Sequence, residues 1–352
     1  MTIRVGLLGL NYGARVHLPA YRANPKYEVV AVCARTPGRA EQVAREHNIP
    51  ACYTDARRLI NAPDVDLVSI ATPPRTHAGL AAAALAAGKH AVVEIAFVGT
   101  ALDARVLVDM ARQHQRLGTA AFVLRYVPHI RLVNDLLAQA AIGPLRLVRL
   151  DFLSNFLTLP DQPWRWLWEA ENGGGVLAGF LSHGIDLLRQ WFGPVRAVDG
   201  TLATLSEVKD LAPGLTPADD TGLVTLHFES GLLATLNFSA MVAYPHVRTE
   251  LHGAHGSLFI DGFGDEVSLL AMGQDSARPV YPTAAYLEET RGQSGLPAGF
   301  QQYLDRLADA VDTGNVPADF PTFESGLEVT RVLDAARLAS REGRRVRLAE
   351  IS

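Results

Sequence analysis

One acidic residue, Glu94, stands at the end of a run of apolar residues and is followed at once by Ile95. Burial of a carboxylate is costly unless hydrogen bonds or a ligand compensate, and no basic residue stands beside this one. Two other side chains could move a proton. His183 has an unperturbed pKa of about 6.5 and could accept a proton near neutral pH, and Tyr126 is a possible proton donor. These residue types suit the removal of a proton from an alcohol.

A glycine-rich turn follows the first apolar run of the chain. Gly9, Asn11 and Ala14 occupy the three positions of the Gly-x-Gly-x-x-Gly spacing, with Tyr12 and Gly13 between them. A turn of this kind, between a strand and the N-terminus of a helix, binds a pyrophosphate through backbone N–H groups and the helix dipole. Asn11 departs from the pattern, because the second position is normally Gly so that the backbone can approach the phosphate. Taken alone, this stretch fits a dinucleotide site and a ligand-free turn equally well.

The end of the second predicted strand bears on which dinucleotide would bind. An acidic residue there would bind the ribose hydroxyl groups of NAD, but this chain has Ala34, Arg35 and Thr36. An arginine without an acid favours a 2′-phosphate and therefore predicts NADP(H) over NAD(H). The alternative is that Arg35 is simply solvated.

The first third of the chain alternates short apolar runs with helix-like stretches. Continuous apolar runs of this length are typical of strands that are buried on both faces. Thr54 is a plausible N-cap for one helix, and Gly88 is a good C-cap residue for another. Strands are predicted over 3–10, 27–34, 65–72, 91–96 and 119–127, and helices up to about residue 23 and over 38–48, 53–64, 75–90 and 101–118. This βαβ alternation predicts a parallel sheet with helices on both faces.

The pattern changes after about residue 145. The segment 221–240 contains a hairpin signal at residues 229–231, and the stretch 206–220 has no regular pattern and predicts a mobile loop. Longer strands are predicted over 145–154, 195–205, 221–240, 247–262 and 266–272, and helices near 299–313 and 324–342. The sequence therefore predicts an α/β protein in which a second, mainly antiparallel sheet follows the parallel one.

Composition excludes several classes of partner. The chain has 352 residues, enough for two domains with sizeable cores, and its formal net charge is −5. This charge argues against nucleic-acid and anionic-membrane partners. Cys33 and Cys52 are interpreted as reduced core thiols, and no metal site is predicted because neither they nor the histidines have metal-ligand spacing. No signal peptide or membrane-spanning stretch is recognisable, which predicts a cytoplasmic protein.

His17 follows Gly9 by eight residues, and four longer stretches of the chain fall into one pattern with this spacing. They are "IATPPRTHAGLAAAALAAGKHAVVE" (70–94), "LRYVPHIRLVNDLLAQAAIG" (124–143), "PWRWLWEAENGGGVLAGFLSHGIDLL" (163–188) and "LHGAHGSLFIDG" (251–262). Together they resemble the Gfo/Idh/MocA family, named for glucose–fructose oxidoreductase, inositol dehydrogenase and a rhizopine catabolism protein. The resemblance extends over nearly the whole chain.

This resemblance implies a Rossmann dinucleotide-binding domain over 1–122, followed by a substrate-binding and oligomerisation domain over 123–352. The second domain would have an open, mainly antiparallel sheet, and its C-terminal helix could pack back on the first domain. The resemblance also implies an NAD(P)-linked reaction on a sugar, cyclitol or related polyol. Homodimers or homotetramers would form through the C-terminal sheet.

The resemblance also assigns roles to residues by position. It places Glu94 near the nicotinamide ribose and His183 at the reacting carbon. The other positions expected near the cofactor are Thr72, Pro73, Pro74, His77, Trp164 and Arg165. The positions expected to face the substrate are Ile95, Arg125, Gly179 and Asp186.

Two proton-handling positions of the family pattern are substituted. The Lys of the family's Glu-Lys-Pro is Ile95 here, which would leave the nicotinamide end of the pocket less polar. The Asp of the family's G-G-G-x-L-x-D-x-G-x-H is Gly179 here, while His183 remains. Asp186 follows His183 on the same helix face, where a substrate contact and an ion-pair or capping role fit equally well.

These residues leave two functions to compare. The first is an NADP(H)-preferring oxidoreductase that uses His183, because hydride transfer from an alcohol needs a base for the hydroxyl proton. The alternative, which the missing Lys and Asp favour, is a catalytically impaired protein that binds a dinucleotide or sugar as a sensor or regulator. Redox-assisted glycoside cleavage with tightly held NAD has no specific support, and Arg35 argues against it. The alternative for His183 itself is a histidine at a helix N-terminus that hydrogen-bonds a neighbour.

Overall fold

The computed structural model describes residues 2–158, 165–206, 214–288, 290 and 292–351. The chain divides into two compact units, which are described separately. Unit 1 comprises Met1–Phe122 and Phe300–Glu328, and unit 2 comprises Val123–Gly299 and Val329–Ser352.

The segment Phe300–Glu328 belongs to unit 1, whereas the division drawn from the sequence placed it in the second domain. Two buried hydrogen bonds explain the difference. The Tyr27 hydroxyl donates to the carbonyl oxygen of Leu304 at 2.7 Å, and the Gln301 side chain donates to the carbonyl oxygen of Ala20 at 2.9 Å. A late segment of the chain thus completes the core of the first unit.

Unit 1 is built on a six-stranded parallel sheet with the order β3-β2-β1-β4-β5-β6. Its strands are β1 (Ile3–Leu8), β2 (Tyr27–Cys33), β3 (Ala51–Tyr53), β4 (Leu67–Ile70), β5 (His90–Val93) and β6 (Gly118–Ala120). The order reverses between β1 and β4, which are neighbours although β2 and β3 intervene in the chain. The carboxyl ends of two such strands form the switch point at which open α/β sheets bind ligands.

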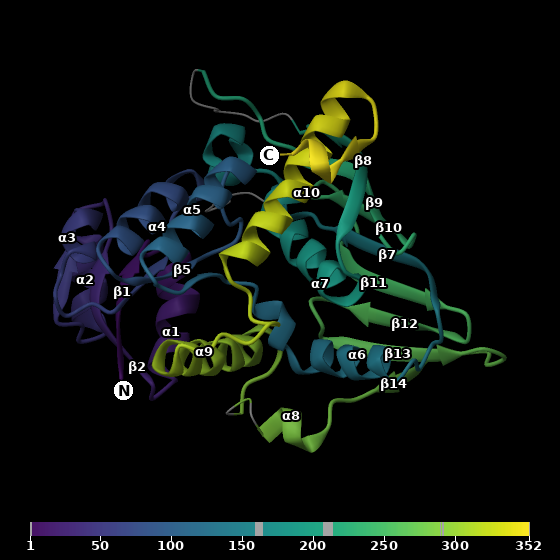
Figure 1. Ribbon diagram of the computed structural model, residues 1–352, viewed down its shortest axis with the longest axis horizontal. Helices are drawn as coiled ribbons and strands as arrows, with labels where there is room; N and C mark the ends of the chain where they lie inside the picture. Colours follow the sequence, from purple (N-terminus) through teal and green to yellow (C-terminus); the bar gives the residue numbers. More distant parts are fainter. Residues whose placement is uncertain (1, 159–164, 207–213, 289, 291, 352) are drawn as a thin grey trace. The chain divides into compact units, whose positions relative to one another are not determined.

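Helices cover both faces of this sheet, which confirms the predicted arrangement. Figure 1 shows α4 and α5 on one side of the sheet and α1 and α9 on the other. Leu67, Val68 and Ile70 of β4 are fully buried, as expected for a strand covered on both faces. The helices are α1 (Leu18–Arg22), α2 (Arg39–Glu46), α3 (Ala56–Ile60), α4 (His77–Ala86), α5 (Ala101–Gln113) and the part of α9 (Gly295–Thr313) from Phe300 onward.

Three local predictions for this region were wrong. The strand predicted over 119–127 is only β6, because the chain turns after Ala120 and then forms a 3₁₀ helix over Val123–Tyr126. The N-cap of α3 is Asp55 rather than Thr54, since the Asp55 carboxylate accepts the Arg57 N–H at 2.9 Å. The short strand β3 was not predicted, and Cys52 within it, predicted to be a core thiol, is exposed.

Unit 2 is built on a nine-stranded sheet with the order β14-β13-β12-β11-β7-β10-β9-β8-β15. Neighbouring strands are antiparallel except β7 and β10, which are parallel, so the predicted open and mainly antiparallel sheet is confirmed. The strands are β7 (Leu145–Leu153), β8 (Val195–Ala203), β9 (Thr221–Phe228), β10 (Leu233–Ser239), β11 (His246–Gly253), β12 (Gly256–Asp261), β13 (Glu266–Ala271), β14 (Arg278–Val280) and β15 (Val346–Arg347).

The two faces of this sheet differ in character. Along β7, Val148, Leu150 and Phe152 are buried, whereas Leu147 and Arg149 are exposed, which is the period-two alternation of a sheet with one covered face. Figure 1 shows α6, α7 and α10 on the same side of the sheet. The helices assigned to this unit are α6 (Pro128–Ala138), α7 (Ser182–Phe192), α8 (Ala284–Glu288) and the part of α10 (Phe323–Glu342) from Val329 onward.

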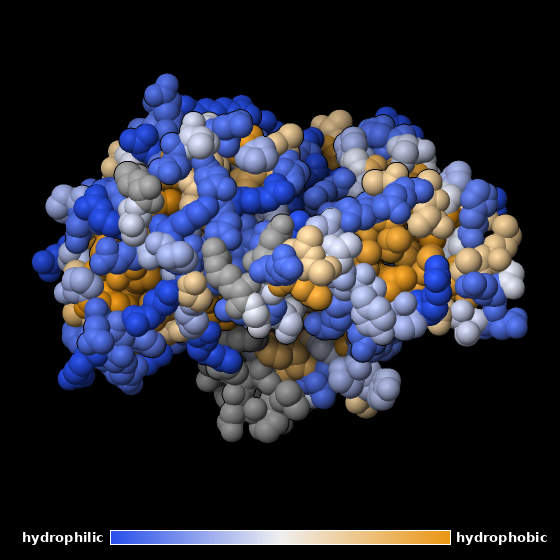
Figure 2. Space-filling view, turned by 90° about the horizontal axis from the view of Figure 1, so that it is seen from below, coloured by the Kyte–Doolittle hydropathy of each residue, from blue (hydrophilic) through white to orange (hydrophobic). Residues whose placement is uncertain are grey.

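The surface view in Figure 2 is largely hydrophilic, with separate apolar areas. Exposed apolar side chains of unit 2 include Leu223, Tyr244, Met272 and Tyr281. Across the described residues, no helix has the length and apolar character needed to cross a membrane.

We expect the folded protein to lose stability in acid because of His90, a residue of unit 1. Its Nδ1 accepts the backbone N–H of Leu117 at 3.0 Å, and burial together with the charge of Arg116 lowers the pKa of His90 to about 4. Because the folded-state pKa lies below the unfolded value of about 6.5, this stability is present above about pH 6.5 and is lost as the pH falls toward 4. We expect the free energy of unfolding to drop by about 3 kcal/mol over that range from this group.

The measurement is urea unfolding at pH 7.5 and pH 4.5, with His90→Asn as the matched variant. An asparagine side chain still offers an acceptor for the Leu117 N–H but does not titrate. The variant should therefore lose clearly less stability in acid than the wild type. Equal losses in the two proteins would show that His90 does not carry the effect.

Candidate functional site

The glycine-rich turn lies at the carboxyl end of β1 and packs closely on the chain that follows β4. Gly9 has a φ of +92°, and a Cβ there would lie 2.4 Å from the carbonyl oxygen of Ala71. Both the conformation and the close approach therefore require glycine. Gly13 begins a π-helical segment, Gly13–His17, that leads into α1. Asn11 is exposed and Tyr12 is half-buried, so the asparagine side chain does not fill the inside of the turn.

The end of β2 carries the predicted arginine and a second one that the sequence analysis missed. Arg35 and Thr36 are exposed, and Ala34 is half-buried. Arg39, the first residue of α2, donates from Nη2 to the carbonyl oxygen of Leu10 at 3.2 Å, so its guanidinium lies against the glycine-rich turn. The signal that could have indicated this residue is a second arginine four positions after Arg35.

The turn after β4 is held by His77. Thr72 and Pro73 are half-buried, Pro74 is buried, and His77 is fully buried. The His77 ring contacts the carbonyl oxygens of Thr72 at 2.7 Å through Nε2 and of Phe97 at 2.9 Å through Nδ1. Burial lowers the pKa of His77, although the hydrogen bonds to these carbonyl groups oppose the shift. The structure thus places His77 inside unit 1, where it ties two loops together.

Glu94 has a buried partner that the sequence analysis did not pair with it. Its carboxylate lies 2.6 Å from Nε2 of His17, and Nδ1 of that ring lies 2.9 Å from the Ser69 hydroxyl. The π-helical segment after the glycine-rich turn brings His17 to this place, and Ser69 comes from β4. Three neighbouring strand ends therefore contribute to one polar cluster at the switch point of the sheet.

The chain after Glu94 is apolar and enclosed. Ile95, Ala96 and Phe97 are all buried, and the peptide bond between Ile95 and Ala96 is cis. Phe97 packs on Phe323 with ring centroids 4.9 Å apart. An isoleucine thus occupies the position at which the family pattern has its catalytic lysine.

In unit 2, a turn of three glycines precedes the helix that carries His183. A Cβ on Gly174 would lie 2.5 Å from the carbonyl oxygen of Trp166, and a Cβ on Gly175 would lie 2.3 Å from the Asp219 carboxylate. The chain then forms a π-helical segment over Leu177–Leu181 and continues as α7, of which His183 is the second residue. His183 is half-buried. π-helical segments of this kind occur frequently at functional sites.

The space beside Gly179 is filled by a leucine. A Cβ at this position would lie 3.0 Å from Cδ2 of Leu167, which is buried. An aspartate side chain at position 179 would therefore need the end of the Leu167 side chain to shift by a few tenths of an ångström.

Asp219 is another carboxylate that the sequence analysis missed. It accepts the backbone N–H of Leu177 at 2.9 Å, at the start of the segment that leads to His183. Burial raises the pKa of the Asp219 carboxyl group. The Asp-Asp pair in the irregular stretch before β9 gave no signal that could have assigned it to this helix.

Arg125 and Asp186, both predicted near the substrate, bind each other. The guanidinium donates to the two carboxylate oxygens at 2.7 and 2.5 Å, and the two side chains are 7% and 1% exposed. The sequence left open whether Asp186 contacts the substrate or has an ion-pair or capping role, and the structure shows the ion pair. Tyr126, the neighbour of Arg125 in the 3₁₀ helix, is buried.

Two predictions concern residues that are wholly or partly undescribed. Trp164 lies outside the described residues. A mobile loop was predicted over 206–220, and its residues 207–213 also lie outside the described part. Arg165 begins a 3₁₀ helix over Arg165–Trp168. For Arg165 itself, only the backbone is described.

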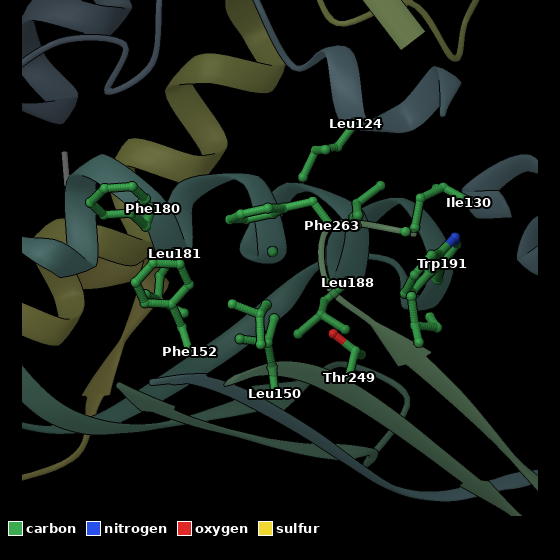
Figure 3. A pocket seen from close by; sticks show the side chains of 16 residues that line it. Leu124, Ile130, Leu150, Phe152, Phe180, Leu181, Leu188, Trp191, Thr249 and Phe263 are labelled. Carbon is green, nitrogen blue, oxygen red and sulfur yellow. The ribbon is translucent and has the colours of Figure 1, made fainter. Parts of the chain in front are cut away.

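An apolar cavity lies behind α7, between this helix and the sheet (Figure 3). Its volume is about 40 Å³, and its walls include Leu124, Leu181 and Leu188. Phe152 and Phe180 stack at one end with ring centroids 4.8 Å apart. This cavity is a gap between α7 and the sheet of unit 2.

The residues of unit 1 define a class of protein. A parallel sheet with the order 3-2-1-4-5-6, a glycine-rich turn after β1 and polar groups at the ends of β4 and β5 form a Rossmann dinucleotide-binding unit. The required glycine at position 9 and the two arginines near the turn fit a dinucleotide. Within the described residues, no group of three or more His, Cys, Asp and Glu side chains is arranged to hold a metal ion.

Comparison with known proteins names the family. Residues 3–122 match the model of the oxidoreductase family with an NAD-binding Rossmann fold, and residues 130–259 match that of the GFO/IDH/MocA C-terminal domain. The chain belongs to the Gfo/Idh/MocA oxidoreductase family, as its sequence motifs predicted. It is therefore an NAD(P)-dependent oxidoreductase that acts on CH–OH groups.

Two relatives and one solved structure illustrate the similarity. Levoglucosan dehydrogenase of Pseudarthrobacter phenanthrenivorans is 25% identical over an alignment of 371 positions, which covers 95% of each chain. The dTDP-3,4-didehydro-2,6-dideoxy-alpha-D-glucose 3-reductase of Saccharopolyspora spinosa is 30% identical over 263 residues, 74% of each chain. A solved structure of levoglucosan dehydrogenase in complex with NADH and L-sorbose has a TM-score of 0.89 at 25% identity and covers 99% of each chain.

Proposed function

We propose that this protein is an NADP(H)-preferring oxidoreductase that interconverts an alcohol and a ketone on a sugar, cyclitol or related polyol. The observation that carries the proposal is the cluster at the switch point, where the Gly9 turn, Ser69 and Glu94 lie at the ends of β1, β4 and β5. Its relatives include a levoglucosan dehydrogenase and a reductase of a nucleotide-linked sugar, which supports a sugar-like substrate.

The preference for NADP(H) rests on the end of β2. The family description names NAD, and the related structure was solved with NADH. In this chain, however, residues 34–39 include Arg35 and Arg39 and contain no acid. A 2′-phosphate adjoining the glycine-rich turn would meet two guanidinium groups, whereas the ribose hydroxyl groups of NAD would meet no carboxylate there.

The roles of the chain's residues follow from their places. The oxidised nicotinamide group, when bound, accepts a hydride from the alcohol carbon. Gly9 and Gly13 give the pyrophosphate close access to backbone, Glu94 accepts hydrogen bonds from hydroxyl groups, and His183 takes the hydroxyl proton. Ile95 leaves the position of the family's lysine without a charge, so His183 carries the proton transfer alone.

Titration with NADPH and NADH, followed by nicotinamide fluorescence, tests the cofactor preference. We expect NADPH to bind more tightly than NADH. Arg35→Ala should weaken NADPH binding by about ten- to a hundredfold, the effect of losing a hydrogen bond to a charged group, and should leave NADH binding unchanged. Arg39→Ala should act in the same direction.

Arg45→Ala is the matched control, because Arg45 is an exposed arginine near the other end of α2. It should alter the affinity for neither nucleotide. Equal affinities of the wild type for NADPH and NADH would reject the preference and leave Arg35 as a solvated side chain.

A sensor or regulator is the second candidate function. Ile95 and Gly179 stand at the positions of two proton-handling groups of the family pattern, which favours a protein that binds ligands without turnover. A screen of sugars and ketones for NADPH oxidation, and of polyols for NADP⁺ reduction, separates the two candidates. Nucleotide binding without turnover of any compound in such a screen would favour the sensor.

We also propose that the protein forms homodimers or homotetramers through the outer face of the unit 2 sheet. The strand register places Leu147, Asp151 and Leu223 on this face, and the two leucines are 44% and 60% exposed. Arg149 pairs with Asp151 there at 2.6 Å. Light scattering of the chain in solution measures the oligomeric state.

A further inference from the structure

His17 lies between a carboxylate and a hydroxyl group inside unit 1. Its Nε2 is 2.6 Å from Glu94 Oε2, and its Nδ1 is 2.9 Å from Ser69 Oγ. His17 and Ser69 are fully buried, whereas the Glu94 side chain is 14% exposed. The row of groups therefore runs from the interior toward the surface at the carboxyl ends of β4 and β5.

The chemistry of the two partners bears on the hydrogen bonds that His17 makes. An ionised carboxylate only accepts hydrogen bonds, so Nε2 donates to Glu94. The Ser69 hydroxyl can donate to Nδ1 of a neutral ring or accept from Nδ1 of a protonated one. Ser69 thus gives Nδ1 a partner in either state while Nε2 binds Glu94.

Aromatic rings surround the imidazole and hold it in place. Phe300 meets it edge-on with ring centroids 5.0 Å apart, and Tyr12 does so at 5.9 Å. Tyr21 packs at 6.4 Å in a tilted arrangement. This packing keeps the ring in one plane and shields its hydrogen bond to Glu94 from water, which strengthens the bond.

The place of Glu94 indicates what the row is for. Its carboxylate adjoins the switch point, where a dinucleotide would bind. The next residue is Ile95, so no neighbouring lysine orients or neutralises the carboxylate. The charge of Glu94 also acts on Tyr12, Tyr21 and His77, but the described hydrogen bond to its carboxylate comes from His17.

We propose that His17 is a positioning residue that holds the Glu94 carboxylate in the orientation required to bind ribose hydroxyl groups of the cofactor. This inference rests on the proposed function, because it takes the ligand to be NADPH or NADH. Ser69 acts one step further back, through its hydrogen bond with Nδ1 of His17. Neither His17 nor Ser69 touches the ligand.

A double-mutant cycle with NADPH titration tests the role of His17. His17→Ala and Glu94→Ala should each weaken NADPH binding by about ten- to a hundredfold, the effect expected for a hydrogen bond to a charged group. If His17 acts through Glu94, the double variant should bind NADPH no more weakly than Glu94→Ala alone. Losses that multiply in the double variant would overturn the proposal.

Three variants separate positioning from folding. His17→Gln keeps an N–H donor and should restore most of the affinity that His17→Ala loses, although both remove the ring from its aromatic surroundings. Ser69→Ala should weaken binding less than His17→Ala does. His90→Asn changes a histidine elsewhere in unit 1 and should not alter the affinity. Thermal unfolding of each variant shows whether it is folded, and failure of His17→Gln to restore binding in a folded protein would count against the proposal.

Nucleotide binding by the wild type separates failure of the proposed function from failure of the role proposed for His17. A wild type that binds neither NADPH nor NADH overturns the proposed function, and the role of His17 with it. A wild type that binds NADPH, with losses that multiply in the double variant, overturns the role of His17 alone.

Discussion

Replacement of His183 by alanine is expected to lower kcat by roughly 10²- to 10⁴-fold, the usual contribution of one well-placed general base. The affinity for the nicotinamide cofactor should stay the same, because His183 is assigned to the reacting carbon of the substrate rather than to the cofactor. His183 is half-buried and is the second residue of α7, so the substitution removes no large part of the core. The measurement is steady-state turnover of the substrate identified by screening, together with an NADPH titration of the variant.

His246→Ala is a suitable control, since His246 is an exposed histidine at the start of β11 in the same unit. It should leave kcat unchanged. Tyr126→Phe is the second comparison: Tyr126 is 4% exposed, so we expect a smaller effect than for His183. A normal kcat in His183→Ala, combined with a collapse in Tyr126→Phe, would transfer the proton-handling role to the tyrosine.

The parallel sheet of unit 1 was predictable because its strands are buried on both faces. Such strands appear in a sequence as short continuous apolar runs, and the polar helices between them separate the runs clearly. The same rule failed over 119–127. Those residues are buried both in β6 and in the 3₁₀ helix over Val123–Tyr126, so an apolar run by itself could not show where the strand ends.

The candidate site was predictable only where one segment carries its own signal. The glycine-rich turn and Arg35 belong to local patterns with a known physical purpose. By contrast, His17 and Glu94 are 77 residues apart, and Arg125 and Asp186 are 61 residues apart. Which strand ends are neighbours depends on the strand order, and no spacing in the sequence reports that. Leu167, which fills the space beside Gly179, was equally hidden, because its contact depends on side-chain packing.

The second large effect is expected from the buried pair of Arg125 and Asp186. Removal of one partner leaves the other charge buried without compensation, so Arg125→Ala and Asp186→Ala should each lower the free energy of unfolding by about 3–5 kcal/mol. A joint replacement by apolar side chains of similar size, Arg125→Met with Asp186→Leu, should recover most of that loss. Urea unfolding of the three variants measures this. Arg344→Ala, which breaks the exposed pair with Glu350, should cost far less than either single replacement in the buried pair.

The double variant also separates stability from catalysis. Asp186 lies one helical turn after His183 on α7, and Arg125 holds it from the 3₁₀ helix over Val123–Tyr126. We expect the pair to fix the rotation of the helix that carries His183. If that is its purpose, the Arg125→Met, Asp186→Leu protein should be nearly as stable as the wild type and yet have a reduced kcat. Recovery of both properties would mean that the ion pair only fills the core, and that apolar packing positions His183 equally well.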